Sequence, residues 1–451
     1  LTIAMSTNGN TGYAKTGNTI TLTITASEAV TGLTCTIDGE AATMGGSGTS
    51  WTAALTISGD ETAGAATFSC SGYEDAAGNT GSTDTTADSG SVTIDYTAPT
   101  VNSIAVTGVT NGQYGNSGTY TVIVTASEAL SAAPTLTLAG GSVGSGTGSS
   151  SDTVWTYTFT PTDADESITI DVDSGDISDP AGNPNTATPT QFAFTHDQTA
   201  PTLTIAMSTD GNTGFAKTGN TITLTITASE SVTGLACTID GETATMGGSG
   251  TSWTAALEIS GDETAGAATF SCGSHSDAAG NAGATDTTAD SGAVTIDYTA
   301  PTLTIAMSTS GNTGYAKSGD TITLTITASE SVTGLTCTID GETATMGGSG
   351  TSWTAALTIS GDETEGATTF SCGSHSDAAG NAGATDTTAN SGAVTIDYTV
   401  AAPSEATAAS TPTTDTTPDV VISVGEVGTI AVGGTTGCGL SSSSTMASGS
   451  N

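Results

Sequence analysis

The sequence predicts an all-β protein, built as a row of seven-stranded β-sandwiches that form an elongated rod. Three observations support this fold class. The chain of 451 residues repeats itself, with a period of about 100 residues, the size of one such sandwich. Apolar and hydroxyl side chains alternate in segments such as Thr19–Thr25, which is typical of a strand with one buried face. Turn-forming residues recur about every 8–12 residues, and helical periodicity is absent.

The repeats divide most of the chain into four domains. Domains 1, 3 and 4 are near-identical, and each opens with LTIAMST and closes with VTIDYT. Domain 2 is divergent but keeps TASE, DPAGN and QTAPT at the corresponding places. We expect domains at 1–97, 98–199, 200–299 and 300–400, followed by a Pro/Thr/Ala linker at 401–417. Residues 418–451 are expected to begin a fifth sandwich of another subtype that stops before it closes.

Within domain 1 the alternating pattern predicts seven strands, A to G. They are Leu1–Ser6, Thr19–Ala26, Leu33–Asp38, Glu40–Met44, Ser50–Ile57, Ala65–Gly72 and Ser91–Tyr96. The pair Asp38-Gly39 indicates a two-residue hairpin between strands C and D. The segments Gly45–Gly48, with three glycines, and Gly59–Thr62, which reads GDET, predict the next two turns.

The charge balance excludes two classes of partner. The net charge is −42, with 45 Asp and Glu against three Lys and no Arg. No basic face is available to neutralise the phosphates of a nucleic acid or to dock on anionic lipid. No apolar stretch is long enough to span a membrane, so direct membrane insertion is not expected. The expected partners are other copies of the chain or neighbouring repeats of a longer one.

Six of the seven cysteines form pairs with the same spacing. The pairs are Cys35/Cys70, Cys237/Cys272 and Cys337/Cys372, each 35 positions apart. In domain 1 both cysteines share a strand face with core residues, on strands C and F, which are neighbours in one sheet. We therefore predict three disulfides and an extracellular location. The alternative is a pair of reduced core cysteines.

Two cysteine positions depart from this pattern. Domain 2 has Leu136 and Val172 where the pair should be, so it is expected to fold on packing alone, with Trp155 as its core anchor. Cys438 has no partner in the chain, and its partner is expected on a strand beyond Asn451.

No arrangement of residues predicts catalysis. The chain has three His, and His275 and His375 are equivalent loop residues. Gly140–Gly144 matches the GxSxG pattern but lies in a Gly/Ser loop without a strand-turn-helix context. Phosphate-binding, HExxH and dinucleotide-binding motifs are missing from the sequence. We predict that the protein is not an enzyme.

Three acidic positions recur in all four domains. One is the Glu near the end of strand B: Glu28, Glu128, Glu230 and Glu330. Another is the Asp that opens D-x-A-G-N after strand F: Asp75, Asp179, Asp277 and Asp377. The third is the Asp at the end of strand G: Asp95, Asp197, Asp297 and Asp397.

Strand topology predicts which of these carboxylates meet. The end of B and the loop after F lie at the N-terminal pole of a sandwich, whereas the end of G lies at the opposite pole, beside the next domain. Asp95 is therefore expected to face Glu128 and Asp179. By the same argument Asp197 meets Glu230 and Asp277, and Asp297 meets Glu330 and Asp377.

Converging carboxylates without Lys or Arg suit a hard cation that takes six to eight oxygen ligands. We therefore predict Ca²⁺ at the domain junctions, where it would turn the short TAPT linker into a stiff joint. The alternative is that these residues are solvated strand ends and turn formers, which is a sufficient reason for Asp and Asn in a turn.

The motifs TASE(A/S)VTG, CTIDG, GTSWTA, DAAGN and IDYTAPT resemble the bacterial immunoglobulin-like (Ig-like) repeats of very large secreted adhesins and surface-layer proteins. The resemblance covers nearly the whole chain. It implies that the repeats act as extender stalks, often with calcium at the linkers. The sequence departs from the pattern in domain 2, which lacks the cysteine pair.

These observations predict a structural, extracellular repeat protein: a stiff spacer or shaft segment of a large cell-surface adhesin or filament. One alternative is a subunit of a surface layer or homopolymeric filament, in which copies contact each other. A second is a carbohydrate-binding adhesion module. The second ranks last because few aromatic residues fall in loops, chiefly Tyr13, Tyr73, Phe215 and Tyr315.

Overall fold

The computed structural model describes residues 1–149, 152–186 and 191–400. Beyond residue 403 it gives only the backbone of β36 (Ser404–Thr407), β37 (Val421–Val424), β38 (Gly428–Thr429), β39 (Thr445–Met446) and β40 (Gly449–Ser450). The rest of the predicted linker and fifth domain, and Cys438, lie outside the described residues. Within the described part, no helix is long and apolar enough to cross a membrane.

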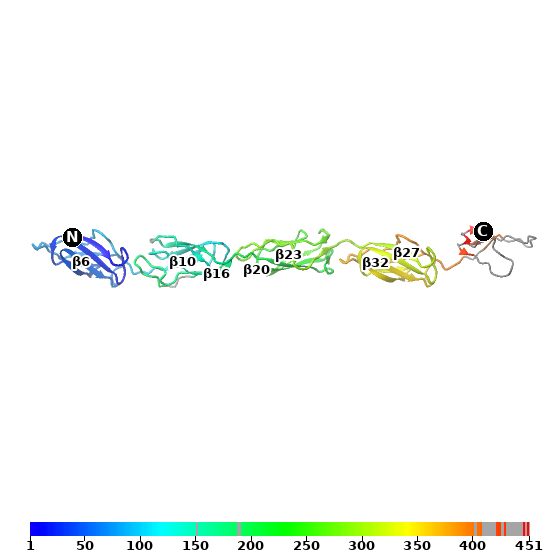
Figure 1. The fold of residues 1–451 in the computed structure, drawn as a ribbon, viewed down its shortest axis with the longest axis horizontal. Coiled ribbons are helices and arrows are strands. Elements are labelled where there is room, and N and C mark those ends of the chain that lie inside the picture. The colour runs from blue at the N-terminus through cyan, green and yellow to red at the C-terminus, as the bar shows by residue number, and fades with distance from the viewer. Residues whose placement is uncertain are drawn as a thin grey trace, which may run out of the picture.

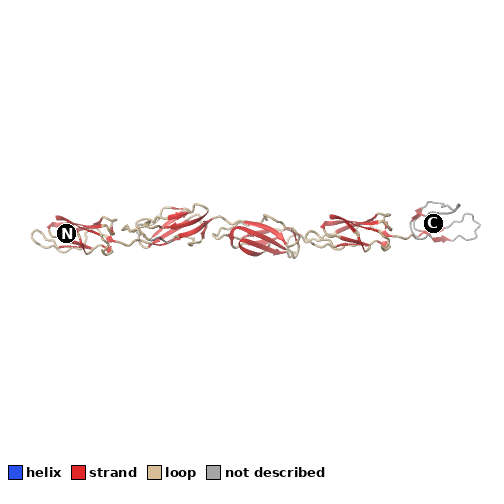
Figure 2. Cartoon of the chain, turned by 90° about the horizontal axis from the view of Figure 1, so that it is seen from below, coloured by secondary structure: helices blue, strands red, loops and turns tan. Residues whose placement is uncertain are grey.

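The described residues form tandem Ig-like β-sandwiches, as the sequence predicts. Two views at right angles show the four domains following one another in a line (Figures 1 and 2). Among the described residues, each domain meets only the domains next to it in sequence (Figures 1 and 2). The functional questions therefore concern the surfaces where one domain ends and the next begins.

Domain 1 has one layer of long strands and one of short strands. The long layer has the order β1 (Thr2–Thr7), β3 (Thr19–Val30), β6 (Thr43–Thr56), paired antiparallel. The other layer consists of β5 (Glu40–Ala41), β4 (Thr34–Ile37) and β8 (Phe68–Ser71), together with β2 (Tyr13–Ala14), β9 (Thr93–Ile94) and β7 (Gly64–Ala65). Strand β2 runs parallel to β9, so the chain changes sheet between β1 and β2.

Domains 3 and 4 repeat this topology strand for strand. In domain 3 the strands are β18 (Leu203–Thr209), β19 (Phe215–Ala216), β20 (Thr221–Val232), β21 (Ala236–Ile239), β22 (Glu242–Thr243), β23 (Thr245–Glu258), β24 (Gly266–Ala267), β25 (Phe270–Gly273) and β26 (Thr295–Ile296). In domain 4 they are β27 (Leu303–Thr309), β28 (Tyr315–Ala316), β29 (Thr321–Val332), β30 (Thr336–Ile339), β31 (Glu342–Thr343), β32 (Thr345–Thr358), β33 (Gly366–Ala367), β34 (Phe370–Gly373) and β35 (Thr395–Ile396).

Domain 2 keeps two layers but joins its second layer into one continuous sheet. One sheet has the order β10 (Val101–Val106), β12 (Tyr120–Ala126), β15 (Val154–Thr160), β14 (Ser142–Val143). The other has the order β11 (Tyr114–Gly115), β17 (Phe192–Asp197), β16 (Asp165–Asp171), β13 (Thr137–Ala139). Trp155 lies in its core, with 4% of its surface exposed.

The alternation read from the sequence corresponds to burial. In β3, Ile20, Leu22 and Ile24 are fully buried, whereas Thr23 and Thr25 face solvent. The same pattern recurs in β20 and β29. The hydroxyl side chains on the outward face can form hydrogen bonds with water, and they add no charge to the surface.

Two turn predictions had different outcomes. Asp38 and Gly39 have φ of 48° and 85° and close a two-residue hairpin between β4 and β5, as predicted. The predicted turn at Gly45–Gly48 is wrong, because these residues belong to the single strand β6. Gly46 instead bends that strand, with φ of 87°, and a Cβ there would come within 2.3 Å of the Ser50 carbonyl oxygen.

The three predicted disulfides are present. Cys35 and Cys70 lie directly opposite each other on β4 and β8, with Cα atoms 4.1 Å apart. Cys237–Cys272 and Cys337–Cys372 repeat this arrangement. By loop-closure arguments each bond stabilises its domain by about 3–4 kcal/mol. In domain 2, Val172 is fully buried and Leu136 packs against the core.

Candidate cation site at the domain joints

A group of three carboxylates forms at each of the three joints between described domains. In every group one oxygen from each residue lies within 4.8 Å of the others. The groups are Asp95, Glu128 and Asp179 at joint 1–2, Asp197, Glu230 and Asp277 at joint 2–3, and Asp297, Glu330 and Asp377 at joint 3–4. Each group combines one residue of the preceding domain with two of the following domain. These are the residues that strand topology predicted would meet.

Three other predicted residues belong to no such group among the described residues. Glu28 and Asp75 lie in domain 1, and no domain precedes it in the described chain. Asp397 lies at the far end of domain 4, where its carboxylate accepts a hydrogen bond of 3.1 Å from the Thr399 amide. Each of these residues occupies the repeat position of a joint carboxylate but has no described neighbouring domain to meet.

An asparagine connects the two domains at each joint. In joint 1–2 the Asn183 amide nitrogen Nδ2 donates to Oδ2 of Asp179 at 2.8 Å and to the backbone oxygen of Asp95 at 2.9 Å. The backbone N–H of Asn183 donates to Oδ1 of Asp179 at 2.8 Å. The D-x-A-G-N loop is therefore closed on itself and attached to the last strand of the preceding domain. Asn281 and Asn381 make the same contacts at the other joints.

The linker is held by a second repeated contact. The Thr100 amide donates to Oγ of Ser127 at 2.9 Å, and the Ser127 amide donates to the Thr100 carbonyl at 2.8 Å. The pairs Thr202/Ser229 and Thr302/Ser329 repeat both bonds. Because the serine directly precedes the joint glutamate, this contact places the glutamate beside the linker.

Burial and mutual repulsion act on the joint carboxylates. Asp179, Asp277 and Asp377 are 0%, 5% and 3% exposed. Burial raises the pKa of Glu128, and the charges of Asp95 and Asp179 raise it further. The pKa values of Glu230 and Glu330 are raised by burial and by their own neighbouring carboxylates. Each site thus disfavours its own full ionisation, which a bound cation would relieve.

The oxygen atoms of each group are suitable ligands for a hard cation. Every side chain of the three groups offers carboxylate oxygen, the ligand that Ca²⁺ prefers. At joint 1–2 the residues that would hold the ion are Asp95, Glu128 and Asp179.

Two of the joints hold a lysine that was not predicted to lie there. The Lys15 ammonium donates to the Gly182 carbonyl, and Nδ2 of Asn10 donates to the Pro180 carbonyl at 2.9 Å. In joint 3–4, Lys217 and Asn212 bond the carbonyls of Gly380 and Ala378 at 2.5 and 2.8 Å. A signal was available, because all three lysines of the chain, Lys317 included, occupy the same position of the repeat.

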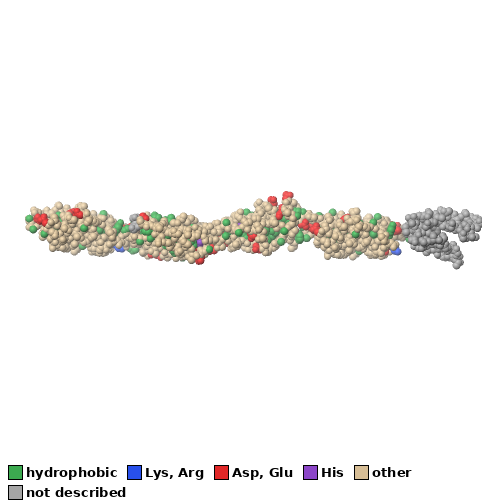
Figure 3. Space-filling view, turned by 45° about the horizontal axis from the view of Figure 1, so that its top comes forward, with side chains coloured by type: hydrophobic (Ala, Val, Ile, Leu, Met, Phe, Trp, Pro, Cys, Tyr) green, Lys and Arg blue, Asp and Glu red, His purple; other side chains and the backbone are tan. Residues whose placement is uncertain are grey.

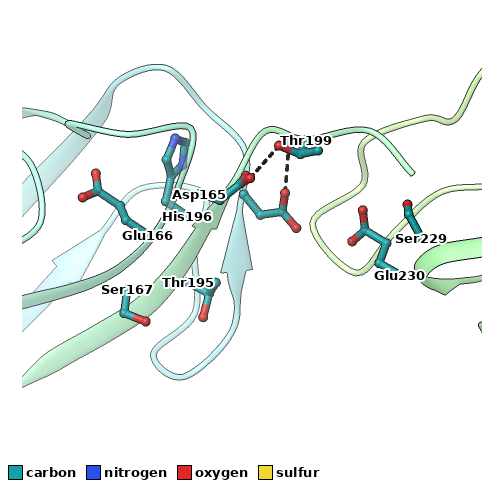
Figure 4. Close-up of a pocket in the computed structure, with 9 residues that line it drawn as sticks. Asp165, Glu166, Ser167, Thr195, His196, Thr199, Ser229 and Glu230 are labelled. Carbon is teal, nitrogen blue, oxygen red and sulfur yellow. Dashed lines mark hydrogen bonds between the residues drawn. The ribbon is translucent and has the colours of Figure 1, made fainter. Parts of the chain in front are cut away.

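Joint 2–3 has a different composition. Asn116 stands at the lysine position and its Nδ2 lies 3.3 Å from Oδ1 of Asn281. Asp165 adds a further carboxylate beside Asp197 and accepts a hydrogen bond of 2.6 Å from the Thr199 hydroxyl. An open hollow of about 630 Å³ lies here, and Figure 4 shows Glu230 on the far side of it from Asp165.

The histidines are more buried than loop residues would be. His275 and His375 lie in loops after β25 and β34, as predicted, but only 2% of the surface of each is exposed. His196 is 1% exposed and its Nδ1 lies 2.9 Å from the Tyr120 hydroxyl and 3.2 Å from the Gly115 carbonyl.

The surface between the joints is mostly uncharged and polar. Only 11% of the residues are charged. Figure 3 shows that most of the visible face is neither acidic, basic nor hydrophobic. Against this mostly uncharged surface, each joint brings three carboxylates together.

Comparison with known proteins supports the Ig-like fold. Residues 297–396 match a family described as a bacterial Ig-like domain. A search of curated protein sequences found no match.

Solved structures with tandem Ig-like or related domains are similar at low identity. The I9–I11 tandem from titin is 12% identical, with a TM-score of 0.25, and the match covers 65% of this chain and 100% of that one. The ectodomain of mouse nectin-like molecule 4 is 12% identical, with a TM-score of 0.24 and the same coverage. The fibronectin(III)-like modules of Clostridium thermocellum CbhA are 12% identical, with a TM-score of 0.22, over 43% of this chain and 93% of that one.

Proposed function

We propose that this chain is a stiff extracellular spacer, a shaft segment of a large cell-surface adhesin or filament, whose joints are set by bound Ca²⁺. The observation that carries the proposal is the meeting of three carboxylates, from two successive domains, at each described joint. A row of such joints would transmit position and force along the chain. Spacing of this kind needs no catalytic group.

Repulsion within each group supplies the physical reason for a cation. Two unit charges about 4 Å apart repel by roughly 1 kcal/mol in water and roughly 4 kcal/mol near a protein surface. Two of the three pairs at each joint run between the domains, because the preceding domain supplies one carboxylate and the following domain two, and these two pairs oppose close contact between the domains. A divalent cation replaces this repulsion with attraction to both domains, so it favours the extended, ordered joint.

The disulfides support an extracellular setting. Bonds such as Cys35–Cys70 persist in oxidising surroundings and are rare in the reducing cytosol. Salt in the extracellular medium would also screen the repulsion among the 45 acidic residues of the chain.

The test is thermal unfolding and small-angle X-ray scattering of the chain with CaCl₂ and with EGTA. We expect calcium to raise the unfolding temperature and to narrow the distribution of maximum dimensions. Mg²⁺ at equal ionic strength is the control for screening, because Mg²⁺ dehydrates reluctantly and is seldom held by all-protein sites. A change of less than about one degree, with identical scattering in calcium and EGTA, would remove the ion from the proposal.

A further inference from the structure

The three described joints are of two kinds. At joints 1–2 and 3–4 a lysine of the preceding domain donates to a glycine carbonyl in the D-x-A-G-N or D-P-A-G-N loop of the next domain: Lys15 to Gly182, and Lys217 to Gly380. At joint 2–3 the equivalent residue is Asn116, whose amide reaches only the side chain of Asn281, at 3.3 Å. A hydrogen bond from a charged donor is stronger than one from a neutral amide.

Five residues before each lysine, the side-chain amide of an asparagine donates a second hydrogen bond to the same loop of the next domain. Asn10 bonds the Pro180 carbonyl and Asn212 bonds the Ala378 carbonyl, at 2.9 and 2.8 Å. Each of these joints therefore has a two-point contact, on two carbonyls of the same loop, that involves none of the clustered carboxylates. The contact forms between protein groups alone and requires no ion.

Joint 2–3 lacks this contact and carries more negative charge. Asp165 lies opposite Asp197 on the neighbouring strand, outside the three-carboxylate group, and no lysine of the described residues bonds across this joint. The open hollow of about 630 Å³ lies at this joint, beside Asp165 and Glu230 (Figure 4). Residues of both domains line this hollow, among them Thr195 of domain 2 and Ser229 of domain 3.

We propose that Lys15 and Lys217 hold their joints without a cation, so that cation removal bends the rod between domains 2 and 3. The rod then behaves as two stiff pairs of domains joined by one ion-dependent hinge, among the joints that the structure describes. This inference rests on the proposed cation site for the hinge, but the role of the lysines is independent of it.

The test uses pairs of spin labels on cysteines that replace outward threonines of neighbouring domains, in the full chain with Cys438 replaced by serine. The labelled positions are Thr23 with Thr158, Thr158 with Thr225, and Thr225 with Thr325, one pair for each joint. Double electron–electron resonance gives the width of each distance distribution in CaCl₂ and in EGTA. We expect EGTA to broaden the pair across joint 2–3 at least twofold and to leave the other two pairs nearly unchanged.

Substitutions then assign the difference to the lysines. Lys217→Asn introduces the residue that domain 2 has at this position, and we expect it to broaden the distance distribution across joint 3–4 in EGTA. We expect Asn116→Lys to narrow the distance distribution across joint 2–3 in EGTA. Lys317→Asn is the matched control, because Lys317 occupies the same repeat position but contributes to none of the three labelled joints.

The outcomes separate this inference from the proposed function. Equal broadening of all three joints in EGTA, or no effect of Lys217→Asn, overturns the role of the lysines. If calcium changes no distribution but Lys217→Asn still broadens joint 3–4, the cation site and the ion-dependent hinge fail while the lysine contact stands.

Discussion

The Tyr96 hydroxyl donates a hydrogen bond of 2.8 Å to Oε2 of Glu61, a carboxylate with 7% of its surface exposed. The pairs Tyr298/Glu263 and Tyr398/Glu363 repeat it at 2.9 and 2.7 Å. Glu61 also accepts the amides of Ser58 and Gly59 at 3.0 and 2.9 Å. Because Tyr96 directly follows Asp95, this buried carboxylate fixes the chain where it leaves domain 1.

Acid is expected to lower the unfolding free energy of domains 1, 3 and 4 through Glu61 and its equivalents Glu263 and Glu363. Burial by itself raises the pKa of Glu61, but the hydrogen bonds from Ser58, Gly59 and Tyr96 outweigh burial and lower the pKa from 4.5 to about 2. Since the pKa is lower in the folded state, the stabilisation is complete above about pH 4.5 and is lost as the pH falls toward 2. Hydrogen exchange of β3 between pH 2 and pH 6 measures the loss.

The variant Glu61→Gln tests the assignment. We expect it to cost domain 1 about 1–3 kcal/mol near neutral pH, the usual cost of disturbing a buried charged hydrogen-bond network, and to flatten the acid dependence of domain 1. Domain 3, with Glu263 intact, is the internal control in the same molecule. An unchanged acid dependence of domain 1 would assign it to other carboxylates.

Removal of one joint glutamate is expected to remove one cation. Isothermal titration with CaCl₂ should give three sites per chain for the described joints, and Glu128→Gln should leave two, because that side chain supplies one of three carboxylates at joint 1–2. Glu28→Gln is the matched control, at the same repeat position but in no three-carboxylate group of the described residues. An equal loss of binding in both variants contradicts the assignment.

Loss of a disulfide is expected to destabilise only its own domain. Cys35→Ala with Cys70→Ala should lower the unfolding free energy of domain 1 by about 2–4 kcal/mol, because the unfolded chain regains the entropy of a closed loop. Hydrogen exchange of β1 and β3 measures this change. Domain 2, whose core has Val172 in place of a cysteine, should be unaffected, and a matching change there would indicate a global effect.

Pulling on the rod is expected to release different lengths from its domains. In domains 1, 3 and 4 the disulfide closes a loop of sequence separation 35, which cannot extend, so each should release about 120 Å less chain than domain 2. Force spectroscopy measures these steps. A reducing agent should abolish the difference, and equal steps before reduction would show that the disulfides do not carry the load.

Much of the fold was predictable because its signals are local. The alternation in Thr19–Thr25, the Asp38-Gly39 hairpin and the cysteine spacing each depend on residues close in sequence or on an exact repeat. The turn predicted at Gly45–Gly48 was wrong because glycine serves both turns and bends within a strand, and only its pairing partners distinguish them. In the structure Gly48 pairs with Val30 of β3.

The meeting of carboxylates at the joints followed from strand direction, since the end of one domain must lie beside the start of the next. The lysine contact did not follow, because it depends on the rotation of one domain about the rod axis, which no local pattern encodes. Lys15 and Gly182 are 167 residues apart, and Asp165 reaches Asp197 only through the pairing of β16 with β17.

The sequence by itself determined the all-β class, the repeat, the disulfide pairs and the acidic residues of each joint, because hydrophobic alternation and covalent spacing are properties of the chain. The tertiary structure alone decided which joints a lysine holds and where an extra carboxylate and a hollow fall. Those features arise from the relative orientation of packed domains, which is the sum of many weak contacts between residues distant in sequence.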